Sequence, residues 1–208
     1  MTRKTPVIVA AGLLAALAAG LAVPAPAASA PAGPQTLPAT RPAALVATDV
    51  EGTARRPLAV PADSKGVVVF FLAHDCPISN SYAPEVNRIC AAYGGPKGFS
   101  FALVHPYQKL EAAEARQHAK DYGYVAPVFV DGDRALTTAL GARVTPQAVV
   151  VGPDGTVLYR GRIDDKWVGY GRGRVEPTAR DLRNALDAIA AGKPAPPPTG
   201  EPVGCPIE

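Results

Sequence analysis

The chain has 208 residues, of which 48% are apolar and 19% are charged, and its formal net charge is +3. This length suits one domain with an ample core, and the apolar content excludes a wholly disordered chain. The near balance of charges, with no run rich in Lys and Arg, excludes a nucleic-acid binder. The three cysteines are too few for a disulfide-built miniprotein, and their odd number leaves at least one thiol unpaired within the chain.

Residues 1–30 predict a secretory signal peptide. A positively charged start precedes an apolar run over 7–23, and the small residues that follow allow cleavage after Ala27 or Ala30. The competing interpretation is an uncleaved anchor, although the run is short for a span of about 20 residues. We expect export to a periplasmic or extracellular space, where disulfides persist, with no stable membrane contact after signal cleavage.

The beginning of the mature chain predicts a spacer, a hairpin and a buried strand. The Pro-, Ala- and Thr-rich stretch over 31–43 is typical of a flexible spacer. Asp49 to Gly52 predict the turn of a short hairpin within 44–60. The unbroken β-branched and aromatic run over 67–72 predicts a strand buried on both faces of a sheet.

Strands and helices then alternate along the chain. Helical spacing predicts helices over 82–93 and 109–122, and a last helix that Thr178 caps and Gly192 ends. Further strands are expected over 99–104, 127–130, 147–151 and 156–160. Parallel strands with helical crossovers, followed by an antiparallel hairpin, predict a mixed sheet flanked by helices. We therefore expect a single α/β domain over 44–192, followed by a Pro-rich tail over 193–208.

Cys76 lies between the buried strand and the helix that follows it. Reactive groups collect at the carboxyl ends of strands in such sheets, and the first-turn amides of the helix favour a thiolate there. Pro77 suits the first helical turn because it has no N–H to leave unpaired. The alternative is a half-buried structural cysteine, for which this position offers poor packing. We expect Cys76 to be a reactive thiol.

The other two cysteines lie in contrasting environments. Cys90 falls on the apolar stripe of its predicted helix, which is typical of an inert core thiol. Cys205 lies near the end of the Pro-rich tail, which spans about 3.1 Å per residue and can reach back to Cys76. We expect these two to pair; the alternative is a disordered tail with an incidental thiol.

Several motifs together resemble the thioredoxin-like superfamily, in its redoxin branch with alkyl hydroperoxide reductase and thiol-specific antioxidant proteins. They are the strand 67–72 running into Cys76-Pro77, Pro84 in the first helix, Val144-Thr145-Pro146, and the segment 149–164. The chain is most similar to exported redoxin-domain proteins with a single Cys-Pro-Ile-Ser-Asn motif and a Gly-Cys-Pro-Ile tail. The resemblance implies a thioredoxin-like fold in which Pro146 is cis and faces the active cysteine. The backbone of Thr145 would then pair with an extended substrate or partner.

Three departures from related families bear on which thiol reactions the chain can carry out. Ser79 stands where thioredoxins carry their second cysteine, so a local disulfide with Cys76 is excluded. Tyr82 replaces a glutamate of the thioredoxins of cytochrome maturation. Ala73 and Val69 replace the Thr and Pro of peroxiredoxins, and the Thr orients the peroxide, which disfavours efficient peroxidase chemistry.

We therefore expect an extracytoplasmic thiol–disulfide oxidoreductase without a cofactor. Cys76 attacks a disulfide and Cys205 resolves the mixed disulfide, with Thr145, Pro146, Pro77 and Ser79 as substrate-binding residues. The partner would be a disulfide-bearing protein, or a small thiol or peroxide substrate; the reductant is not specified. One alternative is a peroxiredoxin-like thiol peroxidase, and another is a Cys76–Cys205 bond that serves only as a structural clasp.

A third alternative is a copper-binding thioredoxin-like protein. Thiolate and imidazole suit copper, and His74, Cys76 and Cys205, with His105, are the candidate ligands. Against this, solvent exposure explains His105 at the end of its strand equally well, and His118 is expected to be a solvated partner of Glu114 on a helix face. The paired aspartates at 131–133 and 164–165 lack the calcium-loop pattern and are interpreted as turn residues.

Overall fold

The computed structural model describes residues 1–2, 35–36, 44–61, 63–95 and 97–208. The chain divides into two units, Met1–Ala30 and Pro31–Glu208. The predicted signal peptide coincides with the first unit and, beyond its first two residues, lies outside the described residues. Within the predicted spacer 31–43 only Gln35–Thr36 are described, and they pair with the main sheet as a short strand. Among the described residues, no helix is both long and apolar enough to span a membrane.

The main sheet of the second unit has eight strands within the described residues, in the order β1-β9-β8-β4-β5-β6-β2-β3. They are β1 (Gln35–Thr36), β2 (Ala47–Asp49), β3 (Ala54–Arg55), β4 (Gly66–Phe71), β5 (Phe99–His105), β6 (Val128–Val130), β8 (Gln147–Val151) and β9 (Thr156–Gly161). β4 pairs in parallel with β5 and antiparallel with β8, so the predicted mixed sheet is confirmed. β2 and β3 form the predicted hairpin.

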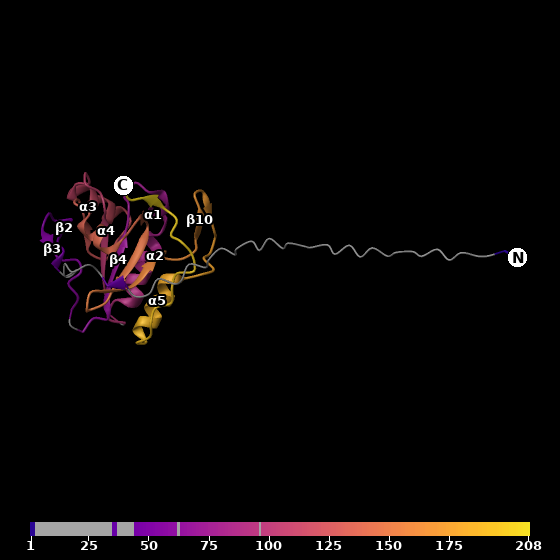
Figure 1. Ribbon diagram of the computed structural model, residues 1–208. Coiled ribbons are helices and arrows are strands. Elements are labelled where there is room, and N and C mark those ends of the chain that lie inside the picture. The colour runs from indigo at the N-terminus through magenta and orange to yellow at the C-terminus, as the bar shows by residue number, and fades with distance from the viewer. Residues whose placement is uncertain (3–34, 37–43, 62, 96) are drawn as a thin grey trace. The chain divides into compact units, whose positions relative to one another are not determined.

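Two short strand pairs lie outside the main sheet. β10 (Trp167–Gly169) pairs with β11 (Arg172–Gly173), and β7 (Val144–Thr145) pairs with β12 (Cys205–Pro206). The first pair is a hairpin formed by neighbouring residues. The second joins residues about sixty positions apart, so it brings the C-terminal tail onto the domain (Figure 1, tail in yellow).

The central strand β4 is buried on both faces. Successive side chains of a strand point to opposite faces. Val68 and Phe70 therefore enter one hydrophobic cluster, while Val69 and Phe71 enter another. Every residue of β4 is buried, as predicted from its apolar run. The strand is held firmly on both sides, and so is the point where the chain leaves it toward Cys76.

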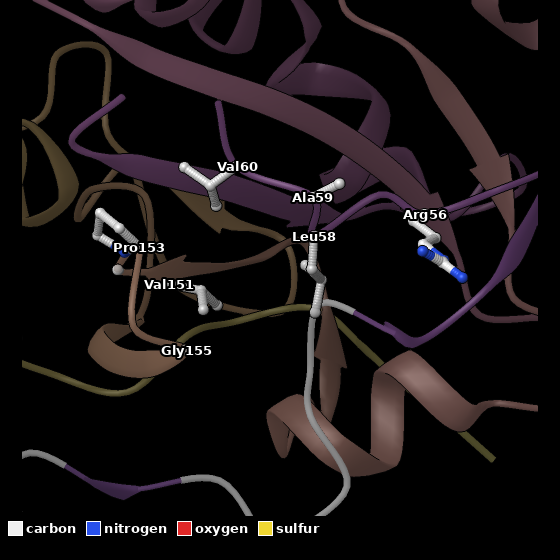
Figure 2. Close-up of a pocket in the computed structure, with 8 residues that line it drawn as sticks. Arg56, Leu58, Ala59, Val60, Val151, Pro153 and Gly155 are labelled. Atoms are coloured by element: carbon white, nitrogen blue, oxygen red, sulfur yellow. The ribbon is translucent and has the colours of Figure 1, made fainter. Parts of the chain in front are cut away.

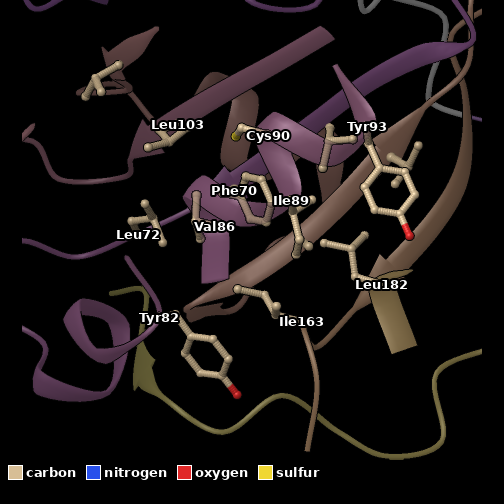
Figure 3. Close-up of a cluster of buried hydrophobic side chains, with 14 of the residues drawn as sticks. Phe70, Leu72, Tyr82, Val86, Ile89, Cys90, Tyr93, Leu103, Ile163 and Leu182 are labelled. Atoms are coloured by element: carbon tan, nitrogen blue, oxygen red, sulfur yellow. The ribbon is translucent and has the colours of Figure 1, made fainter. Parts of the chain in front are cut away.

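Helices cover both faces of the sheet. α2 (Ala83–Tyr93) and α5 (Asp181–Ala190) bury their apolar stripes in the first cluster, to which α3 (Ala112–Asp121) adds one alanine (Figure 3). α4 (Ala135–Leu140) contributes two leucines to the second cluster. α1 (Pro77–Ser81) begins directly after Cys76 and is followed by α2.

Helix ends differ from the predicted ones where side chains find other partners. α3 is shorter than the predicted 109–122, because Glu111 and Glu114 form a capping box at its start. The predicted cap of the last helix is wrong. The N-cap residue is Arg180, since the Thr178 hydroxyl instead donates to the Asp165 carboxylate at 2.5 Å.

Candidate active site

Cys76 is the N-cap residue of α1 and is almost completely buried, with 1% of its surface exposed. The Ser79 N–H donates to Cys76 Sγ over 3.5 Å, so one of the unpaired amides of the first turn faces the sulfur. Pro77 occupies the first helical turn and has no N–H that needs a partner there. The sulfur is thus held by a rigid junction between the buried strand and the helix.

The loop between β7 and β8 forms the opposite wall of the site. The Thr145–Pro146 peptide bond is cis, and Thr145 is fully buried. Cys76 Sγ donates to the Thr145 carbonyl oxygen over 3.6 Å. The cis-proline loop and the strand-to-helix junction, 69 residues apart in the sequence, therefore meet at Cys76.

Cys205 lies at the same place because β12 pairs antiparallel with β7, with Cys205 directly opposite Thr145. Burial, a hydrogen bond with Cys76 and the charges of Cys76 and Asp75 raise the pKa of the Cys205 thiol to about 11. Both thiols are free in this structure. A raised pKa leaves the Cys205 thiol less ionised than an ordinary thiol.

Cys90 is separate from this site. It lies on α2 among the side chains of the first hydrophobic cluster, near Phe70, Val86 and Leu103 (Figure 3). Burial raises the pKa of its thiol to about 12. Burial of this kind makes a cysteine inert, as expected from its place on the apolar stripe.

Ser79 lies in α1, just after the turn that joins β4 to this helix. Its side chain is fully buried, and its hydroxyl accepts a hydrogen bond from the Ala73 N–H at 3.0 Å. The hydroxyl therefore closes the turn between β4 and α1, and it is the backbone amide of Ser79 that faces Cys76. Pro77 is exposed beside it. The substrate-binding role assigned to these residues stays a prediction.

Solvent exposure, which was expected for His118 and was one of two interpretations of His105, is wrong for both. His105 is fully buried rather than exposed, because its strand is covered by α3; its Nδ1 lies 3.1 Å from the Leu72 carbonyl oxygen. His118 is buried as well, and its Nε2 lies 2.8 Å from Asn80 Oδ1 instead of contacting Glu114, which caps α3. Burial lowers the pKa of His105 to about 3 and lowers that of His118.

These two rings form an aromatic row with His74. The ring centroids of His105 and His118 lie 5.0 Å apart, and those of His74 and His105 lie 6.4 Å apart. No group of three or more His, Cys, Asp or Glu within the described part of the chain is arranged to hold a metal ion. Burial lowers the pKa values of His105 and His118, so these two rings pack in the uncharged form.

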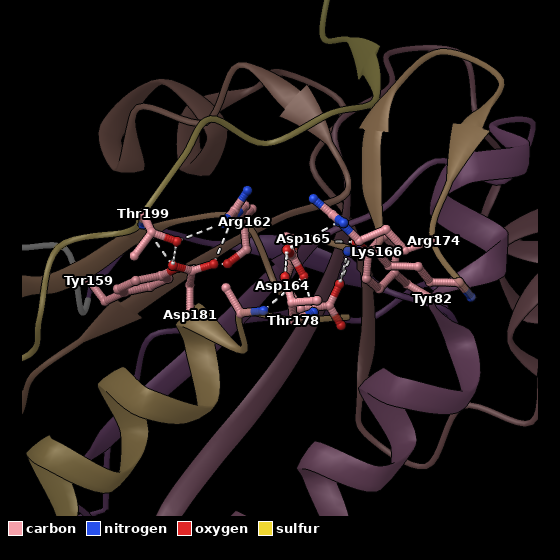
Figure 4. A network of polar contacts seen from close by, with 11 residues as sticks. Tyr82, Tyr159, Arg162, Asp164, Asp165, Lys166, Arg174, Thr178, Asp181 and Thr199 are labelled. Carbon is pink, nitrogen blue, oxygen red and sulfur yellow. Dashed lines mark hydrogen bonds and ion pairs between the residues drawn. The ribbon is translucent and has the colours of Figure 1, made fainter. Parts of the chain in front are cut away.

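The tail is anchored well before it reaches Cys205. The Thr199 hydroxyl and N–H both donate to Asp181 Oδ1 at 2.7 Å, and Arg162 Nη2 donates to the Thr199 hydroxyl at 2.6 Å (Figure 4). Arg162 also pairs with Asp181, at 2.6 Å. No periodicity or motif marks Thr199, so this anchor is visible only in the folded chain.

Asp164 and Asp165 are structural, as their interpretation as turn residues implied. Asp165 accepts hydrogen bonds from the Thr178 and Ala179 amides ahead of α5, and Asp164 accepts one from the Tyr82 hydroxyl at 2.8 Å (Figure 4). Tyr82, which stands in place of the family's glutamate, thus links the start of α2 to a buried carboxylate.

A surface hollow lies away from Cys76. Its volume is about 280 Å³, and it is lined by residues 56–60 and by the turn around Pro153 (Figure 2). Its wall includes Val151, which pairs with Val67 near the beginning of β4, whereas Cys76 follows the other end of that strand. The hollow is therefore no part of the thiol site.

The comparisons with known proteins agree with this architecture. The family model described as Redoxin matches residues 32–171. A hypothetical protein from Sinorhizobium meliloti is 24% identical, with a TM-score of 0.68 over 85% of this chain and 96% of that one. An uncharacterized conserved protein from Geobacillus kaustophilus is 26% identical, with a TM-score of 0.66 over 86% of this chain and 89% of that one.

A putative thioredoxin from Neisseria meningitidis is 25% identical, with a TM-score of 0.53 over 73% of this chain and 91% of that one. No curated protein matches significantly. The expected thioredoxin-like α/β fold is therefore confirmed.

Proposed function

Because the chain belongs to the Redoxin family, we propose that it is an exported thiol–disulfide oxidoreductase in which Cys76 attacks and Cys205 resolves. The observation that carries this proposal is the meeting of the two thiols across Thr145, with one amide of α1 donating to Cys76 Sγ. Export rests on the N-terminal sequence features alone.

The first step forms a mixed disulfide. The Cys76 thiol loses its proton to solvent, and its thiolate attacks one sulfur of a substrate disulfide, RS–SR′. The new bond joins Cys76 Sγ to the RS sulfur, and R′S⁻ leaves with the electron pair of the broken bond. The Ser79 N–H, 3.5 Å from Sγ, stabilises the thiolate before the attack.

In the second step, Cys205 resolves the mixed disulfide. The Cys205 thiolate attacks Cys76 Sγ, RS⁻ leaves, and a Cys76–Cys205 bond forms, so the substrate gains two electrons and the protein loses two. The hydrogen bond with Cys76 and the Cys76 charge help raise the pKa of Cys205 in the dithiol form. Both influences disappear in the mixed disulfide, which lowers this pKa at the stage when Cys205 must react.

The test is to trap the intermediate with oxidised glutathione as the probe. The reduced Cys205→Ser variant should retain one glutathionyl group on Cys76, because the resolving thiol is missing. The wild type should release it and end with a Cys76–Cys205 bond, as seen by non-reducing peptide mapping. A glutathionyl group on Cys90, or a bridge that includes Cys90, would overturn the assignment.

A further inference from the structure

The tail covers the sulfur that the proposed function requires to react. Cys76 is 1% exposed, and Thr145 is fully buried beside it. Cys205 lies directly opposite Thr145, whose carbonyl oxygen accepts the hydrogen bond of Cys76. A thiolate must approach a disulfide sulfur directly. In the reduced protein as it stands, no substrate sulfur can reach Cys76 Sγ.

The tail packs tightly against the loop at Thr145 and Pro146. A Cβ atom on Gly204 would lie 2.0 Å from the Thr145 carbonyl oxygen and 3.0 Å from Pro146 Cδ. Real Cβ atoms do not approach backbone oxygens so closely, so only glycine allows the tail to lie flat against this loop. The contact is therefore specific to the sequence at this point in the tail.

Besides the pairing of β12 with β7, hydrogen bonds at three further places hold the tail on the domain. Thr199 binds Asp181 and Arg162, as described above. The Tyr170 hydroxyl donates to the Gly204 carbonyl oxygen at 2.5 Å, and the Ile207 N–H donates to the Arg143 carbonyl oxygen at 2.9 Å. The tail contributes no strand to the main sheet, so it can open while that sheet stays paired.

We propose that the tail is an autoinhibitory strand, which shields Cys76 in the reduced protein and must leave β7 before Cys76 reacts. This inference rests on the proposed function, in which Cys76 is the attacking thiol. When the tail opens, the substrate reaches Cys76; when it returns to β7, it brings Cys205 to the mixed disulfide. The same segment thus controls access to Cys76 and delivers the resolving thiol.

The test measures how fast iodoacetamide alkylates Cys76 in the reduced full-length protein, by peptide mapping of the singly modified chain. Gly204→Ala should raise the initial rate at Cys76 about tenfold, because losing a backbone hydrogen bond or more shifts an opening equilibrium by that order. Gly95→Ala is the matched control. A Cβ atom at this exposed glycine has nothing within 4 Å, and its rate should equal that of the wild type.

A second variant, Thr199→Val, removes the hydroxyl between Asp181 and Arg162 without touching the thiol site. Its rate at Cys76 should rise as well, while Cys90 stays unmodified and so reports an intact core. Equal Cys76 rates in the wild type and in both variants would overturn the proposal. So would a rise at Cys76 that is always accompanied by an equal rise at Cys90.

Alkylation requires no substrate, so the two proposals can fail separately. Faster alkylation of Cys76 in Gly204→Ala, without any trapped glutathionyl group in Cys205→Ser, would keep the autoinhibitory strand and reject the oxidoreductase. A glutathionyl group trapped on Cys76 in Cys205→Ser, with unchanged alkylation of Cys76 in both tail variants, would keep the oxidoreductase and reject the autoinhibitory strand.

Discussion

Cys205 lies opposite Thr145 in the antiparallel pair of β12 and β7, while the Thr145 carbonyl oxygen accepts the hydrogen bond of Cys76. One buried residue therefore positions both thiols. Because Thr145 precedes a cis proline and is fully buried, the place where the two sulfurs meet is set by the domain and not by the tail alone.

Replacing Ser79 by cysteine should restore the local partner that the chain lacks. The Ser79 N–H already faces Cys76 Sγ, so Ser79→Cys should form the short-range disulfide when Cys205→Ser has removed the resolving thiol. We expect the double variant to regain turnover of oxidised glutathione. Ser79→Ala with Cys205→Ser is the control, since it loses the same bond to Ala73. A double variant that stays glutathionylated at Cys76 would contradict this prediction.

Cys76→Ser should abolish disulfide exchange, whereas Cys90→Ala should leave it unchanged. Serine offers no thiolate, while the Cys90 sulfur is buried and apart from the site. The rate at which each variant turns over oxidised glutathione tests both expectations. Cys90→Ala should cost about 1 kcal/mol of the free energy of unfolding, measured in urea, because a buried side chain becomes smaller. Loss of turnover in Cys90→Ala would mean that the working pair is misassigned.

Removing Cys76 should make Cys205 easier to ionise. After burial, the largest influences that raise the pKa of Cys205 are its hydrogen bond with Cys76 and the Cys76 charge. Cys76→Ala removes both, so the pH midpoint for alkylation of Cys205 should fall below that of the wild type. The pH profile of iodoacetamide labelling, followed at the Cys205 peptide, measures this. An unchanged midpoint would show that the two thiols do not interact.

Asp165 should stabilise the fold at neutral pH and lose this effect in acid. Hydrogen bonds from Thr178 and Ala179, with the nearby Arg174, oppose the effect of burial and lower its pKa from 3.8 to about 2. A lowered folded-state pKa contributes stability above pH 3.8 that disappears as the pH falls toward 2. Asp165→Asn should therefore lower the Tm at pH 7, and the difference from the wild type should shrink between pH 4 and pH 2.

Thermal unfolding followed by circular dichroism across this range provides the measurement. Asp133→Asn is a suitable control, because that carboxylate is exposed and accepts a hydrogen bond from the nearby Ala135 N–H. A wild-type advantage over Asp165→Asn that stays constant down to pH 2 would contradict the assigned role.

The strands of the core were predictable because their signal is local. The run over 67–72 is buried on both faces as β4, and the hairpin near Asp49 forms as expected. α4 went unpredicted since it has six residues, too few for a periodic pattern, and depends on Asp131 to bind its first amides. The predicted cap at Thr178 is wrong for a related reason. The Thr178 hydroxyl binds Asp165, which lies 13 residues away in the sequence.

The histidines also show that local sequence does not predict contacts between elements that are far apart in the chain. Their exposure depends on which helix covers the end of β5, and a single strand's sequence does not contain that information. Local reasoning expected His118 in solvent and left exposure open for His105, and the packing of α3 against β5 and β6 buries both.

By itself the sequence determined where Cys76 lies in the fold, since a buried strand followed by Cys-Pro and a helix fixes the backbone around it locally. It also separated Cys90 from the other two cysteines by its place on an apolar stripe. Only the tertiary structure decided where Cys205 lies and that the tail closes over Cys76. That position results from pairing between β7 and β12 and from the Thr199 anchor, contacts between residues far apart in the chain that no local pattern records.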